Sequence, residues 1–215
     1  MIKVIIADDH PLVRAGLKHL LTSCPDIEFG AEVDNGNELI HELRKQCFDV
    51  VMMDMFMPGR SGIELIKQVK TEHPKLPIIV ISTHKEDIFA LRTIKAGASG
   101  YLCKDYAASN LVDAIRKVYA GGCFISAAVA ELMAKELHTP SEKIAPHTCL
   151  SDREYQIFLL VVKGRSSSDI AEDLNVSIKT VSTHKARIKK KMRMENNSEL
   201  IKYALKYSLI DESDD

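Results

Sequence analysis

Residues 49–54, which read DVVMMD, decide the fold of the first half of the chain. A short, continuous apolar run of this kind is typical of a strand that is buried on both faces of a parallel sheet. The run ends at Asp54, a carboxylate that stands directly after the predicted strand Asp49–Met53. The sequence therefore predicts a buried strand with an acidic group at its carboxyl end.

Similar apolar runs recur on both sides of this strand. They predict further strands over Ile2–Ala7, Glu28–Val33, Ile78–Ser82 and Gly100–Leu102. Apolar residues at helical spacing predict helices over Pro11–Leu21, Asn37–Gln46, Gly62–Glu72, Glu86–Lys95 and Ala107–Ala120. We therefore expect an α/β domain, a flavodoxin-like doubly wound fold whose five-stranded parallel sheet is covered on both faces.

The chain after Leu150 carries a different pattern, because only helical spacing is found there. It predicts an all-α domain of four helices, over Asp152–Lys163, Ser168–Asn175, Lys179–Met192 and Ser198–Ser208. Ser151 and Ser177 are expected N-caps, the first in a capping box with Glu154. The predicted domains cover residues 1–121 and 148–210, with a linker at 122–147 and an acidic tail at 211–215. The linker could hold a helix over Ala127–Leu137.

Composition restricts the class of protein. Apolar residues make up 46% of the 215 residues, yet none of the apolar runs approaches the length of a membrane span. The five cysteines are odd in number and lack CxxC spacing, which argues against a disulfide framework and a zinc site. Two acids follow the start too closely for a signal peptide. We therefore expect a cytoplasmic protein.

Charge is unevenly distributed along the chain. The overall formal charge is −1, but residues 149–210 hold 12 Lys and Arg against 7 Asp and Glu. A basic helical domain suggests an anionic partner, although many solvated helices are also basic.

Polar groups gather at the predicted carboxyl ends of the strands. Asp8 and Asp9 end the first strand, and the other ends carry Asp54, Ser82 and Lys104. These ends share one rim of a parallel sheet, so we expect the groups to converge. Three carboxylates together are costly without a cation, and oxygen ligands suit Mg²⁺. Such a site would let a carboxylate attack a phosphoryl group.

His10 follows the acidic pair and could be mistaken for a metal ligand or a phosphorelay histidine. We expect it to contact the start of the first helix instead, since oxygen ligands already suit Mg²⁺.

Four segments together resemble the receiver domains of two-component response regulators: residues 4–10 (VIIADDH), 50–59 (VVMMDMFMPG), 80–83 (VIST) and 97–105 (GASGYLCKD). The resemblance implies that Asp54 is the phosphoacceptor and that Lys104 binds the phosphoryl group, with Ser82 and Tyr101 as the switch pair. It implies Mg²⁺ ligation by Asp9, Asp54 and the Phe56 carbonyl, and by Asp8 through water. Asp105 departs from the common pattern, in which proline often follows the lysine.

The predicted helix Lys179–Met192 has two different faces. Val181, Ile188 and Met192 fall on one side of a helical wheel and should be buried. The opposite side mixes cations with small and hydroxyl side chains, which suits a major groove. The preceding short helix and tight turn would complete a helix-turn-helix. The candidate DNA-binding residues are Lys179, Thr180, Ser182, Thr183, Ala186, Arg187, Lys189 and Lys190.

Residues 150–154 (LSDRE), 170–184 (IAEDLNVSIKTVSTH) and 190–192 (KKM) resemble LuxR-type helix-turn-helix domains. With a receiver in front, the chain resembles the NarL/FixJ group of response regulators. Ser182 and the pair Ser167-Ser168 depart from residues common in that group, so no particular base contact carries over. His184 is expected to pack rather than to touch DNA.

This resemblance implies a transcription factor rather than an enzyme. The implied partners are a sensor histidine kinase, duplex DNA with a two-fold repeat and a second copy of the chain on activation, with RNA polymerase as a further candidate. The last predicted helix could supply the dimer contact or pack on its own domain.

Two other functions compete with this reading. The chain could be an interaction protein whose DNA-binding half has degenerated, but the exposed face of residues 179–190 keeps its basic character. It could be an enzyme with Asp54 as a covalent nucleophile for a diffusible substrate, but the sequence offers no second base beside the pocket.

Overall fold

The computed structural model describes residues 1–57, 62–82, 87–138, 146–174, 176–207 and 209–210. The chain divides into two compact units, Met1–Thr139 and Pro140–Asp215. The predicted linker, residues 122–147, therefore falls on both sides of this division. Among the described helices, none is long and apolar enough to cross a membrane.

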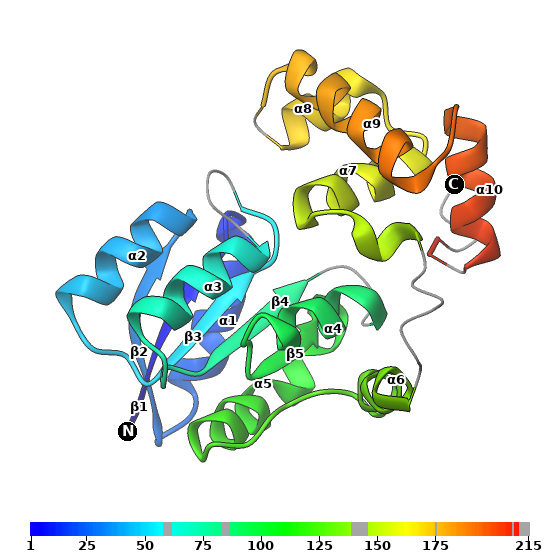
Figure 1. Ribbon diagram of the computed structural model, residues 1–215. Coiled ribbons are helices and arrows are strands. Elements are labelled where there is room, and N and C mark those ends of the chain that lie inside the picture. The colour runs from blue at the N-terminus through cyan, green and yellow to red at the C-terminus, as the bar shows by residue number, and fades with distance from the viewer. Residues whose placement is uncertain (58–61, 83–86, 139–145, 175, 208, 211–215) are drawn as a thin grey trace. The chain divides into compact units, whose positions relative to one another are not determined.

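The first unit is built on a five-stranded parallel sheet in the order β2-β1-β3-β4-β5, which confirms the predicted architecture (Figure 1). Its strands are β1 (Ile2–Ala7), β2 (Ile27–Val33), β3 (Val50–Asp54), β4 (Ile78–Ser82) and β5 (Gly100–Cys103). Every residue of β3 and β4 is buried, which explains their continuous apolar runs. The strand order reverses between β1 and β3, so their carboxyl ends frame the crevice where such sheets bind ligands.

Helices cover both faces of this sheet. They are α1 (Pro11–Thr22), α2 (Gly36–Lys45), α3 (Gly62–Glu72), α4 (Asp87–Lys95) and α5 (Lys104–Tyr119). Leu17 and Leu21 of α1 share one core cluster with Leu111 and Ile115 of α5. Glu86, the predicted first residue of α4, lies outside the described residues.

The start of α5 was predicted wrongly. The helix begins at Lys104, directly after β5, and not at Ala107. Its N-cap is Cys103, whose side chain makes no capping hydrogen bond. Neither a capping side chain nor a loop marks this junction in the sequence, so the apolar spacing placed the start almost one turn late.

Part of the predicted linker belongs to the receiver-like unit. The Phe124 amide donates to the Ser99 carbonyl, and the Tyr101 amide donates to the Phe124 carbonyl, so this segment pairs with the edge of β5. A Cβ on Gly100 would lie 3.2 Å from the Phe124 carbonyl oxygen, so a glycine permits the close approach. α6 (Ala127–His138) follows and packs against α4, with Val129 fully buried.

The second unit is helical, as expected. It contains η2 (Pro146–Cys149), α7 (Asp152–Val162), α8 (Ser167–Asp173), α9 (Ile178–Met192) and α10 (Asn197–Lys206). The Ser151–Glu154 capping box and the Ser177 N-cap are both confirmed. A second capping box, between Ser166 and Asp169, starts α8 at Ser167 rather than Ser168. The predicted helix ends Asn175 and Ser208 lie outside the described residues.

The core of the second unit lies under α9. Val181, Ile188 and Met192 are at most 3% exposed, which confirms the predicted buried side. Leu200 and Ala204 of α10 are buried in the same unit, whereas Leu205 is 41% exposed. The inner face of α10 therefore packs on its own domain.

Candidate functional site

Three charged side chains meet at the carboxyl ends of the strands. Lys104 Nζ lies 2.8 Å from Asp8 Oδ2 and 3.0 Å from Asp54 Oδ2. Asp8, which directly follows β1, is 1% exposed, and Asp54, the last residue of β3, is 4% exposed, so both carboxylates are nearly dry. The lysine comes from the first turn of α5, and it bridges the two acids that the sheet brings together.

Burial and charge compete at this pocket. Burial raises the pKa of the Asp54 carboxyl; the Lys104 ammonium opposes this effect and the Asp8 carboxylate adds to it. Burial lowers the pKa of Lys104, but attraction to Asp54 and Asp8 outweighs it, and the net shift is upward. The lysine therefore stays charged, while Asp54 is a carboxylate whose negative charge is only partly compensated.

Asp9 and His10 complete one side of the pocket. The His10 amide donates to Asp8 Oδ1 at 2.8 Å, and the His10 Nδ1 atom lies 2.7 Å from Asp9 Oδ1. Asp9 Oδ1 is buried, yet it accepts no hydrogen bond of good geometry from the described residues. An orphaned buried carboxylate oxygen beside Asp8 and Asp54 fits a bound cation, because a divalent ion would supply the missing positive charge.

Arg14 is a pocket residue that the sequence did not indicate. Its Nη1 atom donates to the Asp8 carbonyl at 2.6 Å and so holds the end of β1 against α1. Arginines occur in the first turn of a helix in many structural roles, and no local sequence pattern indicates that Arg14 contacts the end of β1.

The predicted switch residues lie on two paired strands. Ser82 is the last residue of β4 and Tyr101 belongs to β5, and both are at most 1% exposed. The Tyr101 ring is thus already inside the protein here. Thr83, the next residue of the sequence motif, lies outside the described residues.

Phe56 connects the pocket to α4. Its amide lies 3.4 Å from Asp54 Oδ1, a long hydrogen bond, and its ring packs edge-on against Phe89 at 5.4 Å between centroids. Nothing in the sequence near Phe56 indicated this partner, because Phe89 lies on a separate helix.

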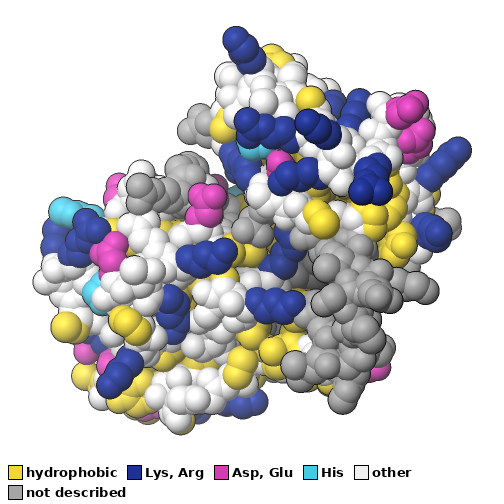
Figure 2. Space-filling model, viewed as in Figure 1, with side chains coloured by type: hydrophobic (Ala, Val, Ile, Leu, Met, Phe, Trp, Pro, Cys, Tyr) yellow, Lys and Arg dark blue, Asp and Glu magenta, His cyan; other side chains and the backbone are white. Residues whose placement is uncertain are grey.

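The exposed face of α9 is the second candidate site. Figure 2 shows Lys and Arg side chains gathered over the second unit. Six of the eight predicted DNA-binding residues are exposed: Lys179, Ser182, Thr183, Ala186, Arg187 and Lys190. Thr180 and Lys189 are only partly exposed.

The hydroxyl groups on this face are partly engaged. Thr180 Oγ1 lies 2.8 Å from Ser177 Oγ at the helix start, and Thr183 Oγ1 donates to the Lys179 carbonyl. His184 is half-buried, as expected of a packed histidine, and burial lowers its pKa.

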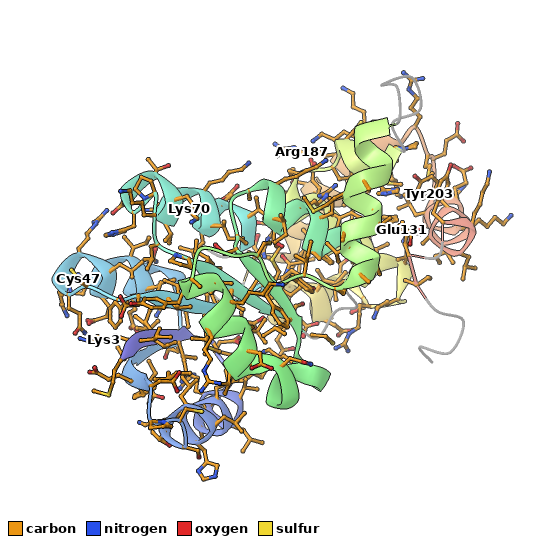
Figure 3. All side chains as sticks on the ribbon, turned by 90° about the horizontal axis from the view of Figure 1, so that it is seen from below. Lys3, Cys47, Lys70, Glu131, Arg187 and Tyr203 are labelled. Carbon is orange, nitrogen blue, oxygen red and sulfur yellow. The ribbon has the colours of Figure 1, made fainter. Side chains whose placement is uncertain are left out.

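Cross-helix contacts hold α9 in place. Lys191 Nζ lies 2.6 Å from the buried Glu154 carboxylate of α7, and Lys185 Nζ donates to Ser167 Oγ of α8 at 3.1 Å. Figure 3 labels Arg187, which belongs to α9, and Tyr203, which belongs to α10. The Tyr203 hydroxyl meets His147 Nδ1 of η2 at 2.7 Å. The two lysine contacts therefore fix the helix that carries the basic face to α7 and to α8.

Comparisons with known proteins agree with both sites. The family profile "Response regulator receiver domain" matches residues 4–116. The profile "Bacterial regulatory proteins, luxR family" matches residues 148–204. The two profiles cover the unit with the acidic pocket and the unit with the basic helix, respectively.

Full-length relatives match the whole chain. Response regulator UvrY of Escherichia coli strain K12 is 36% identical over 97% of this chain and 96% of its own length. Response regulator GacA of Pseudomonas syringae pv. syringae is 35% identical over 99% of this chain and 100% of its own. The RcsB response regulator of Salmonella typhimurium, a solved structure, has a TM-score of 0.62 at 30% identity, covering 95% of this chain and 100% of that one.

These matches decide between the functions that the sequence left open. They place the chain among transcription regulators, and it is not an enzyme. The chain belongs to the NarL/FixJ group of two-component response regulators, which join a receiver domain to a LuxR-type helix-turn-helix DNA-binding domain.

Proposed function

We propose that Asp54 accepts a phosphoryl group from a sensor histidine kinase and that this modification controls DNA binding by α9. The observation that carries the proposal is the contact of Asp54 with Lys104 in a pocket that also holds Asp8. A carboxylate whose negative charge is only partly compensated, at the carboxyl end of β3, is placed to attack phosphorus.

A divalent cation, Mg²⁺ in this family, would be held by Asp9, Asp54 and the Phe56 carbonyl, and by Asp8 through water. When bound, it neutralises charge on the phosphoryl oxygens. The orphaned Asp9 Oδ1 supports this assignment.

Side chains of the protein carry out the other parts of the phosphoryl transfer. An Asp54 oxygen attacks phosphorus, and the bond from phosphorus to the kinase histidine breaks. Lys104 then turns from the Asp54 carboxylate to the phosphoryl oxygens, and Ser82 donates a hydrogen bond to them. Because Ser82 and Tyr101 lie on paired strands, this step would tighten the packing around Tyr101 and alter the adjoining surface of α4 and α5.

DNA is the proposed output ligand. One helix-turn-helix contacts a half-site, so useful affinity requires two copies of the chain on a two-fold repeat. Solved structures of the relative RcsB include a DNA complex and dimers bound to DNA, which supports this proposal. We infer that Lys179, Arg187, Lys189 and Lys190 contact phosphates or guanine edges, while Thr180, Ser182, Thr183 and Ala186 permit close approach.

The remaining assignments follow from this role. Phosphorylation should favour a homodimer, RNA polymerase is a candidate partner at promoters, and a DNA-bound regulator would work in the cytoplasm. We propose that residues 1–121 form the receiver, 148–210 the DNA-binding domain and 211–215 the tail, and that residues 122–147 form a linker whose Phe124 and α6 pack on the receiver.

Labelling with acetyl phosphate and Mg²⁺ tests the phosphoacceptor. Intact-mass spectrometry should find one added phosphoryl group on the wild type and none on Asp54→Ala. Asp34→Ala is a matched control, because this exposed carboxylate follows another strand of the same sheet. Full labelling of Asp54→Ala would contradict the assignment.

Dimerisation is measured on the same protein. Sedimentation with beryllofluoride, a phosphoryl mimic, should move the chain from monomer towards dimer and tighten binding to a two-fold DNA repeat. An identical mass distribution and identical DNA affinity with and without the mimic would rule out phosphorylation-driven dimerisation.

A further inference from the structure

The phosphoryl-transfer proposal gives no role to the His10 ring. His10 Nδ1 and single carboxylate oxygens of Asp8, Asp9 and Asp54 all lie within 4.8 Å of one another. We propose that His10 is a nitrogen ligand in this pocket, which therefore binds a divalent transition-metal ion more tightly than an all-oxygen site would. This inference rests on the proposed function, since it concerns the same cation site.

The position of the ring is set by the backbone. His10 is the N-cap residue of α1 in an extended conformation, the conformation favoured before a proline. Its amide is fixed by Asp8 Oδ1, and its side chain makes no capping hydrogen bond to the helix. The sequence-based expectation of a helix-start contact is thus met by the backbone alone, and the imidazole is available to the pocket.

The distances suit a small octahedral ion. His10 Nδ1 lies 2.7 Å from Asp9 Oδ1 and 3.4 Å from Asp8 Oδ1. Adjacent ligands on an ion with bonds of about 2.1 Å are roughly 3.0 Å apart in octahedral geometry. These atoms therefore have the spacing of neighbouring ligands on one metal ion.

Lys104 does not compete for this side of the pocket. Its ammonium contacts the Oδ2 atoms of Asp8 and Asp54, whereas the ring of His10 faces the Oδ1 atoms of Asp8 and Asp9. The His10 side chain is 64% exposed, so the ring can turn and water can leave at little cost. A cation can therefore enter from the histidine side while the lysine remains in place.

The ligand atoms of the site determine for which metal ion His10 increases the binding affinity. Carboxylate oxygens suit Mg²⁺, while imidazole suits nickel, copper, zinc and iron, whose affinities follow the Irving–Williams order. For Mg²⁺ a water can replace the imidazole with little loss, because this ion usually keeps several waters. The contribution of His10 should therefore be larger for Ni²⁺ than for Mg²⁺.

Calorimetric titration of the full chain with Ni²⁺ alone, and then with Mg²⁺ alone, tests this. The event at the pocket is identified as the one that excess Mg²⁺ displaces and that Asp9→Asn weakens. His10→Asn should weaken Ni²⁺ binding at least about tenfold and weaken Mg²⁺ binding by a smaller factor. His19→Asn is the matched control, an exposed histidine on the same helix that should bind both ions as the wild type does.

Two results would overturn the inference: Ni²⁺ binding in His10→Asn equal to the wild type, or equal losses for both ions. Mg²⁺-dependent labelling of the wild type by acetyl phosphate separates this failure from failure of the proposed function. If the wild type is labelled and His10→Asn binds Ni²⁺ as the wild type does, His10 is not a metal ligand, and the assignment of Asp54 as phosphoacceptor still stands.

Discussion

The acidic pocket and the basic face of α9 use charge in opposite ways. In the pocket, Asp8 and Asp54 are buried and share one ammonium at close range. On α9, Lys179, Arg187 and Lys190 extend into solvent. A buried charge depends strongly on each partner, whereas exposed charges act through their sum and are screened by salt. The pocket should thus respond sharply to single substitutions and the basic face only gradually.

The largest effect should come from Lys104. Replacing it by methionine keeps most of the volume but leaves two buried carboxylates without their shared cation. The free energy of unfolding of the first unit should fall by roughly 3 kcal/mol near neutral pH. The loss should shrink at lower pH, because Asp54, whose pKa is raised already, then takes up a proton. Urea unfolding followed by circular dichroism measures this.

Lys117→Met is the control for this substitution, since Lys117 is an exposed lysine of the same helix. Its replacement should change stability by less than about 1 kcal/mol. Equal losses for Lys104→Met and Lys117→Met would mean that the pocket is no more sensitive than the surface.

Substitution of Asp54 should change the free energy of unfolding in the opposite direction to substitution of Lys104. A carboxyl whose pKa is higher in the folded state than in the unfolded state stabilises the fold below that pKa and loses this contribution as pH rises through it. At neutral pH the ionised Asp54 therefore costs stability, and Asp54→Asn should raise the free energy of unfolding. The gain should decrease towards acidic pH, where the wild-type carboxyl is protonated.

Asp26 provides the contrasting case. Its exposed carboxylate pairs with Arg116, and the hydrogen bond from that arginine lowers the pKa of Asp26. Asp26→Asn should bring no gain in stability at neutral pH. If thermal unfolding finds Asp54→Asn no more stable than the wild type, the pocket does not store the charge strain proposed for it.

Smaller effects are expected on α9. If Arg187 contacts a phosphate, Arg187→Ala should weaken binding to all DNA sequences alike and lower the salt slope by about one unit. Ser182→Ala should instead alter sequence preference, because a small side chain close to the groove floor meets base edges. Fluorescence anisotropy over a range of salt concentrations measures both. Unchanged affinity in both variants would exclude α9 from the groove.

The sequence predicted these two regions unequally well. The sheet followed from continuous apolar runs, and the buried side of α9 from Val181, Ile188 and Met192, since both signals depend on local periodicity. The early start of α5, the pairing of Phe124 with β5 and the contact between Phe56 and Phe89 were missed. The helix start was missed because no capping side chain marks it, and the other two contacts join residues through tertiary packing, for which the local sequence carries no pattern. The sequence placed His10 beside the acidic pair, but only the folded backbone gives the 2.7 Å distance from its ring nitrogen to Asp9.

The smallest predicted effect is an absence of coupling on the basic face. Lys179 and Lys190 lie at opposite ends of α9, about 16 Å apart along a helix that rises 1.5 Å per residue. Their alanine substitutions should weaken DNA binding additively, within about 0.5 kcal/mol, since distant exposed charges share no partner. In the pocket, the cycle Asp8→Asn with Lys104→Met should instead be strongly non-additive in stability, because each side chain is the partner of the other. Two double-mutant cycles, one by DNA titration and one by urea unfolding, make the measurement. Coupling between Lys179 and Lys190 as large as that between Asp8 and Lys104 would mean that the basic face acts as one tightly linked unit, and the contrast between the two regions would fail.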